Sequence, residues 1–129
     1  MEFFETTLTV ENKDLDELNH VNNVQYVHWI NEIAKQHWLH KATEKLLNSH
    51  FWVVVKHTIN YKKPAFLNDE LKLKTFVKHS EGVLSTRVVE IYNNESNDLL
   101  VRAETEYCLI DAQSQRPARI PTEIINLFN

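Results

Sequence analysis

One short stretch of the chain gathers side chains that could act on a polarised carbonyl group. Asp14 and Asp16 lie in a polar segment, His20 follows them, and Asn22 and Asn23 stand directly before an apolar periodicity of helical type. A carboxylate can serve as a base or a nucleophile, and the free N–H groups at a helix start favour negative charge. The stretch is therefore a candidate site for hydrolysing or binding a carbonyl compound, although an ordinary capped helix start has the same composition.

The helix that would position these groups is predicted from Asn23 to about Leu47. Asn22 or Asn23 is the expected N-cap, because a short amide side chain can accept hydrogen bonds from the free N–H groups of the first turn. Apolar residues recur along this segment at the spacing of one helix face: Val24, Val27, Ile30, Ile33, Ala34, Trp38, Ala42 and Leu46. We expect one long helix with an apolar stripe on one side.

Strand-forming residues surround this helix on both sides. Aromatic and β-branched residues predict strands over 3–10, 51–61, 71–77, 83–92 and 99–110, with a polar loop over 11–20. This order predicts an α+β fold in which an antiparallel sheet has one face covered by the helix. The length of 129 residues fits a single domain, residues 1–129.

One predicted strand is too apolar to lie at an exposed sheet edge. The run from Phe51 to Val55 would invite aggregation there. Pairing with the same strand of a second copy across a two-fold axis would remove that edge. We therefore expect a homodimer or a homotetramer.

The composition sets limits on partners and location. Hydrophobic residues make up 43% of the chain, charged residues 25%, and the formal net charge is −4. This charge gives no electrostatic support for nucleic-acid binding, and no apolar run approaches the roughly 20 residues of a membrane span. The start of the chain does not resemble a signal peptide, and the single cysteine, Cys108, excludes an internal disulfide. We expect a cytoplasmic protein with no membrane partner.

The histidines do not predict a metal site. His37 and His40 have the i, i+3 spacing of one helix face, but no Cys or second His pair stands at ligand spacing. We expect these two histidines at the surface or at an interface. No metal and no cofactor is expected.

Two motifs carry a resemblance to a known family. They are Asp14-x-Asp16-x-x-x-His20-Val21-Asn22-Asn23-x-x-Tyr26 and Asn60-Tyr61-Lys62-Lys63-Pro64-Ala65. On these motifs the chain resembles the hotdog-fold acyl-CoA thioesterases of the hydroxybenzoyl-CoA thioesterase type. The stretch from His20 to Trp29 is also similar to the corresponding part of acyl-carrier-protein thioesterases. The resemblance implies a long central helix wrapped by a curved antiparallel sheet of about five strands.

The resemblance also implies an activity and roles for particular residues. The activity is hydrolysis of the thioester of a fatty or aromatic acyl-CoA to the free acid and CoA. The family's catalytic carboxylate falls on Asp16, as nucleophile or as general base, and its backbone donor falls on Asn23 or Val24. His20 is expected to orient the carbonyl or the water. Many relatives have Gly where this chain has Asn19, and Asn tolerates the same left-handed conformation.

Further residues are expected to bind the substrate. Those expected to line the acyl pocket are Val24, Tyr26 and His57. Those expected to meet the phosphates of CoA are Lys62, Lys63 and Arg87, because such phosphates need cations or backbone donors.

Two alternative functions remain open from the sequence. The first is a thioesterase whose donor is an acyl carrier protein. The second is a hotdog protein that binds acyl-CoA without hydrolysing it, because a fold does not fix a function.

Overall fold

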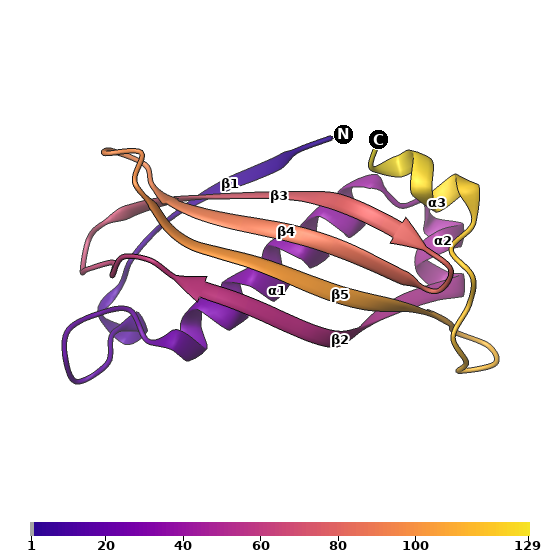
Figure 1. Cartoon of the computed structure of the whole chain (residues 1–129), viewed down its shortest axis with the longest axis horizontal. Coiled ribbons are helices and arrows are strands. Elements are labelled where there is room, and N and C mark those ends of the chain that lie inside the picture. The colour runs from indigo at the N-terminus through magenta and orange to yellow at the C-terminus, as the bar shows by residue number, and fades with distance from the viewer. Residues whose placement is uncertain (1) are drawn as a thin grey trace.

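The computed structural model describes residues 2–129 and consists of one five-stranded antiparallel sheet with a long helix lying across one face (Figure 1). The strands lie in the order β1-β3-β4-β5-β2. Their bounds are β1 Phe4–Thr9, β2 His50–Tyr61, β3 Glu70–Glu81, β4 Leu84–Asn93 and β5 Leu99–Asp111. The predicted α+β architecture is confirmed.

The helical segment differs from the prediction at its end. The long helix α1 spans Asn23–Lys41, and a separate short helix α2 spans Glu44–Ser49. The predicted single helix to Leu47 is wrong because Ala42 is extended (φ −75°, ψ 142°). Thr43 then caps α2, its side chain accepting a hydrogen bond from the N–H of Leu46 (3.2 Å).

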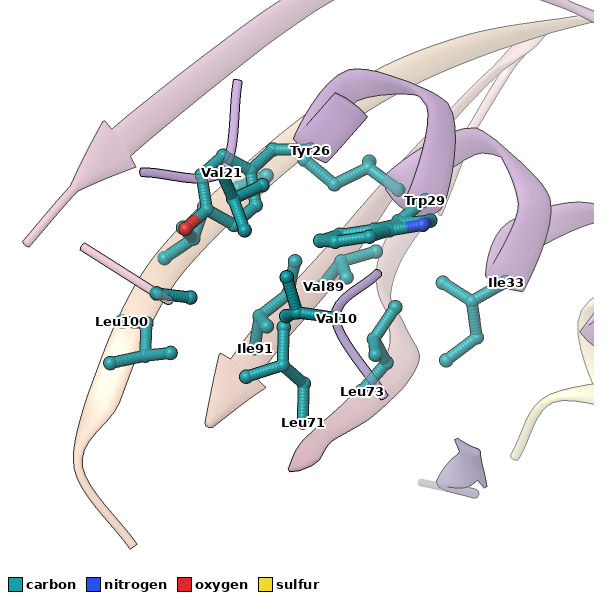
Figure 2. Packing of buried hydrophobic residues seen from close by; sticks show 14 residues of the cluster. Val10, Val21, Tyr26, Trp29, Ile33, Leu71, Leu73, Val89, Ile91 and Leu100 are labelled. Carbon is teal, nitrogen blue, oxygen red and sulfur yellow. The ribbon is translucent and has the colours of Figure 1, made fainter. Parts of the chain in front are cut away.

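The main core lies between the first half of α1 and the centre of the sheet. Figure 2 shows Tyr26 and Trp29 of α1 in the same cluster as Leu73 and Ile91 of the sheet. Ile30 and Ile91 in this cluster are completely buried. The apolar face of α1, with its 3.6-residue period, therefore packs on the apolar face of β3, β4 and β5, with its two-residue period.

A second cluster closes the opposite end of the molecule. The short helix α3 (Thr122–Leu127) lies near α2 there (Figure 1). Trp38 of α1 packs edge-on against Trp52 of β2, with ring centroids 5.7 Å apart. The two ends of the chain also meet, because the N–H of Glu2 donates to the carbonyl of Phe128 (3.2 Å).

Strand β2 lies at one edge of the sheet and pairs with β5 on one side. Its register shifts between Val54 and Lys56, and the Val55 side chain at this bulge is 57% exposed. The apolar run from Phe51 to Val55, which we predicted to form a subunit contact, thus lies on a sheet edge that is unpaired in a single copy of the chain. No helix in residues 2–129 is long and apolar enough to cross a membrane.

Replacing Ile30 by Ala is expected to lower the free energy of unfolding by about 3 kcal/mol, because it removes a completely buried side chain and leaves a cavity. Leu39→Ala on the same helix is the matched control, since Leu39 is 51% exposed. Urea unfolding of both variants measures the difference. Equal losses would contradict the assignment of Ile30 to the core.

Candidate active site

The loop before α1 folds back on itself and brings the acidic pair beside the helix start. Leu15 and Val21 form an antiparallel bridge. The N–H of Asp16 donates to the carbonyl of His20 (2.8 Å), and the N–H of His20 donates to Asp16 Oδ1 (3.2 Å). These two hydrogen bonds fix the position of the Asp16 carboxylate relative to the backbone of His20.

Asn19 makes the reversal of this loop possible. Its φ is +60°, in the left-handed region that favours Gly and tolerates Asn. Its N–H donates to the carbonyl of Asp16 (3.0 Å). Asn19 thus supplies the left-handed backbone conformation that this turn of the loop requires.

The two carboxylates of the loop have different surroundings. Asp14 is 4% exposed, and its Oδ2 accepts from the N–H of Glu11 (2.8 Å). Asp16 is half-buried, and its Oδ1 accepts from the N–H groups of Leu18 (2.9 Å) and His20. Asp16 Oδ2 has no hydrogen-bond partner among residues 2–129. Asp14 is therefore tied into the loop, whereas Asp16 keeps one oxygen available for chemistry.

The first turn of α1, which the loop enters through Asn22, leaves one N–H group available. Asn22 is the N-cap, and its side chain accepts from the N–H of Val24 (2.9 Å). The carbonyl of Asn22 accepts from the N–H of Gln25 (2.9 Å). Within the described chain, the N–H of Asn23 has no acceptor. Of the two donors suggested by the resemblance, Val24 is already engaged and Asn23 is not.

A second loop, over residues 62–69, completes this end of the molecule. The N–H of Val21 donates to the carbonyl of Ala65 (3.0 Å), and the His20 ring lies edge-on to Phe66 with centroids 5.1 Å apart. Lys62 and Lys63 begin the same loop and are exposed, and Lys63 pairs with an aspartate of the neighbouring turn. The structure thus brings Asp16, His20, Asn23 and the two lysines to the same end of α1.

The residues predicted to line an acyl pocket lie in three different environments. Val24 is 74% exposed beside the helix start. Tyr26 is buried, its ring lies beside Val21 in Figure 2, and burial raises the pKa of its hydroxyl to about 12. His57 on β2 is half-buried, its Nδ1 lies 2.8 Å from the Thr105 hydroxyl, and burial lowers its pKa.

Arg87 lies apart from this site. Its side chain, on β4, is 6% exposed, and its Nη1 lies 2.8 Å from Nδ1 of His37. His37 follows Asn23 by fourteen residues of helix, which is about 21 Å along the axis. Arg87 is therefore not beside Lys62 and Lys63, and the structure does not join these three predicted phosphate contacts into one surface.

The expected surface or interface position of His37 is wrong, because its side chain is completely buried. It stacks on Phe4 (centroids 5.2 Å apart) and lies against Phe128. The sequence did contain a signal for this burial. His37 lies three residues after Ala34 and four after Ile33, which puts it on the apolar face of the helix. In the part of the chain described here, no cluster of His, Cys, Asp or Glu could hold a metal ion.

A cavity of about 520 Å³ lies at the opposite end of α1 from Asp16. It is bounded by the C-terminal half of α1, by β2, by the β3–β4 hairpin and by α3. Trp38, Trp52, Val54 and Arg87 are among its lining residues. The apolar residues considered for a pocket from the sequence, Val24 and Tyr26 among them, do not line it.

Comparison with known proteins gives the family. The chain matches the acyl-ACP thioesterase N-terminal domain over residues 2–128. The chain belongs to this thioesterase family. As a member of the thioesterase family it is a thioester hydrolase, and the prediction of this enzyme class is confirmed.

Individual relatives of the thioesterase family agree with this assignment. The long-chain acyl-CoA thioesterase FadM of Escherichia coli is 24% identical over 122 residues, covering 93% of this chain and 92% of FadM. The acyl-CoA thioester hydrolase YbgC of Escherichia coli is 31% identical over 100 residues, covering 67% of this chain and 72% of YbgC. The crystal structure of the probable thioesterase YbaW from Escherichia coli superposes with a TM-score of 0.86 at 22% identity, covering 95% of this chain and 94% of YbaW. The predicted hotdog fold is confirmed.

The burial of His37 predicts how the stability of the protein depends on pH. Burial, together with the charge of Arg87, lowers its pKa from 6.5 to about 4. Between these values the unfolded chain takes up a proton that the folded chain excludes, so stability is lost as the pH falls from 6.5 towards 4. We expect His37 to contribute a loss of about 2 kcal/mol in the free energy of unfolding between pH 7 and pH 5.

Urea unfolding at these two pH values measures this loss. His37→Gln keeps an acceptor for Arg87 but does not titrate, so the pH dependence should be weaker in this variant than in the wild type. His40→Gln is the control, since His40 is exposed. An unchanged pH dependence in His37→Gln would show that His37 is not the buried titrating group.

Proposed function

We propose that the protein hydrolyses acyl-CoA thioesters of fatty or aromatic acids at the loop–helix junction formed by Asp16, His20 and Asn23. The observation that carries this proposal is the pairing of a half-buried carboxylate, with one unengaged oxygen, and an unengaged N–H at the adjoining helix start. The names of FadM and YbgC support acyl-CoA as the donor.

The proposed chemistry needs each of these groups. Asp16 either attacks the thioester carbonyl or removes a proton from a water molecule that attacks it. Negative charge then develops on the carbonyl oxygen, where the N–H of Asn23 and the positive end of α1 would stabilise it. One such donor contributes about 3 kcal/mol to lowering a barrier.

The intermediate collapses by releasing the CoA thiolate. If Asp16 has acted as a base, the thiolate takes the proton that Asp16 removed from water, and the acid is free. If Asp16 has acted as a nucleophile, the thiolate takes a proton from solvent and a water molecule hydrolyses the acyl–Asp16 anhydride, which releases the acid and restores the carboxylate. On either route His20 orients the carbonyl or the water.

We further propose a homodimer formed by antiparallel pairing of β2 with its copy. The Tyr61 end of β2 lies near the helix start, since the Tyr61 and Tyr26 rings are 5.7 Å apart. The other end lies near the cavity, where Trp52 contacts Trp38. A two-fold axis across β2 reverses the direction of the second copy. The helix start of one protomer would then face the cavity of the other, which makes that cavity the acyl pocket.

The roles of the remaining predicted residues follow from this arrangement. Lys62 and Lys63 lie outside the apolar interior and would meet the phosphates of CoA. Val24 is exposed on α1 in one protomer and would become covered at the dimer contact. His57 and Tyr26 would support the acyl pocket from β2 and from the core. A single buried, unpaired Cys108 fits a reducing cytoplasmic location.

An acyl-carrier-protein donor is the second candidate, because the matched family is named for acyl-ACP thioesterases. A carrier protein is acidic and would require a basic rim, which Lys56, Lys62 and Lys63 could provide. Comparing hydrolysis of the same acyl group on CoA and on a carrier protein separates the two donors. Faster turnover of the carrier-protein thioester would overturn the acyl-CoA assignment.

Asp16→Asn is expected to lower kcat at least about a hundredfold, because it removes the base or nucleophile. The amide oxygen can still accept from Leu18 and His20, so the loop should keep its fold. Asp14→Asn is the matched control and should lower stability without a comparable loss of kcat. Thiol release and urea unfolding of both variants give the result, and near-normal kcat in Asp16→Asn would contradict the mechanism.

Val55→Lys is expected to shift the protein from dimer to monomer, because it places a charge in the middle of the β2 edge. Thr7→Lys makes the same change on the exposed face of the opposite edge strand β1 and should leave the dimer intact. Light scattering coupled to size-exclusion chromatography gives the mass of each. A dimeric Val55→Lys variant would exclude β2 as the contact.

A further inference from the structure

The wall of the cavity at the C-terminal half of α1 contains basic residues and no acidic side chain. Its Lys, Arg and His residues are Lys35, His50, Lys78, His79 and Arg87. Lys78 pairs with Glu104 (2.8 Å) and His79 lies 3.3 Å from Glu81, so these two are not free for a ligand. No Asp or Glu from residues 2–129 lines it. The rest of the wall is mainly apolar and includes Trp38, Trp52 and Val54. Such a wall favours a ligand with an apolar body and a negative charge.

Arg87 is the most deeply buried of these basic residues, and it is 6% exposed. Its Nη1 lies 2.8 Å from Nδ1 of His37 and 3.1 Å from Oγ1 of Thr75, to which it donates. Its guanidinium also lies 5.2 Å from the centroid of the Phe128 ring. Over the described residues, no carboxylate forms an ion pair with Arg87. A guanidinium has five N–H donors, so most of them remain available.

The two side chains that accept hydrogen bonds from Arg87 are neutral, and Glu2, whose carboxylate lies 3.8 Å from Nε2 of His37, is on the far side of that ring. His37 accepts from Arg87 through Nδ1, which fixes it as the neutral ring with its proton on Nε2. Thr75 is also neutral, and its hydroxyl already donates to the carbonyl of Val88 (2.8 Å). Burial lowers the pKa of Arg87 to about 10, so it stays charged at neutral pH. A buried charge that contacts no carboxylate directly is costly, and an anionic ligand on Arg87 would lower that cost.

We propose that this cavity binds an organic acid whose carboxylate pairs with Arg87 and whose apolar body packs against Trp38 and Trp52. The carboxylate accepts two parallel hydrogen bonds from the guanidinium, an arrangement that Lys cannot reproduce. This inference rests in part on the proposed function, because the cavity is the one proposed above as the acyl pocket, but binding of the acid there does not require Asp16. The carboxylate can belong to a free acid or to the distal end of a dicarboxylic acyl thioester.

Binding without turnover tests this site. The fluorescence of Trp38 and Trp52 reports on occupancy, and dodecanoate and dodecanol form a matched pair of probes that differ in charge. We expect saturable binding of dodecanoate, at least tenfold tighter than dodecanol, which corresponds to about 1.4 kcal/mol. Equal affinities, or no saturable signal with dodecanoate, would overturn the proposal even if thioester hydrolysis is found.

Two variants locate the carboxylate. Arg87→Gln should weaken dodecanoate binding at least tenfold and leave dodecanol unchanged, whereas Arg102→Gln, which removes a guanidinium paired with Glu90 and Glu104, should change neither. Unchanged dodecanoate affinity in a folded Arg87→Gln variant would overturn the proposal. If that variant fails to fold, the comparison of acid with alcohol on the wild-type protein decides.

A third probe identifies the source of the carboxylate. The mono-CoA thioester of dodecanedioic acid carries a distal carboxylate, and the dodecanoyl thioester carries a methyl group in its place. If the dicarboxylic thioester has the lower KM, and Arg87→Gln abolishes this difference in KM, the carboxylate that binds Arg87 belongs to the substrate. Dodecanoate binding without this difference in KM assigns it to a free acid.

Discussion

The reversal of the chain between Leu15 and Val21 is the constraint on which the candidate site depends. The N–H of Asp16 donates to the carbonyl of His20, the N–H of His20 donates to the Asp16 carboxylate, and Asn19 turns the backbone between them. This reversal uses one oxygen of the Asp16 carboxylate as a structural acceptor and leaves the other available. The side chain of Asn22 acts similarly at the helix start: it accepts from the N–H of Val24 and leaves the N–H of Asn23 available. The same local hydrogen bonds that fold the loop therefore select which groups remain for chemistry.

The length of α1 links this site to the rest of the molecule. Its apolar stripe spans the sheet, so the carboxylate and the cavity lie at opposite ends of the helix. In a single copy of the chain, most of the length of α1 separates Asp16 from the cavity. The open β2 edge offers a physical solution, because antiparallel pairing with a second copy brings opposite helix ends together. The unpaired edge of β2 and the separation of the cavity from Asp16 thus both support the proposed dimer.

Local sequence patterns were sufficient for most of the fold. The alternation in the strands and the helical spacing through Ile30 predicted the sheet and the first part of the long helix, because burial on one face imposes those periods. The break at Ala42 was missed, since Leu46 continues the apolar pattern into a second helix. The motif places Asp16 and Asn23 in one short segment, and the structure folds this segment through the hydrogen bonds between Asp16 and His20. The burial of His37 against Arg87 joins residues fifty positions apart, and only the packing of α1 on β4 brings them together.

Thiol release from a panel of short, medium, long and aromatic acyl-CoAs by the wild-type protein tests the central claim most directly. The account predicts saturable, catalytic release of CoA from at least one member of the panel, at a rate proportional to protein concentration. Saturable binding of acyl-CoA with no release from any member would contradict it. The protein would then bind the thioester without hydrolysing it.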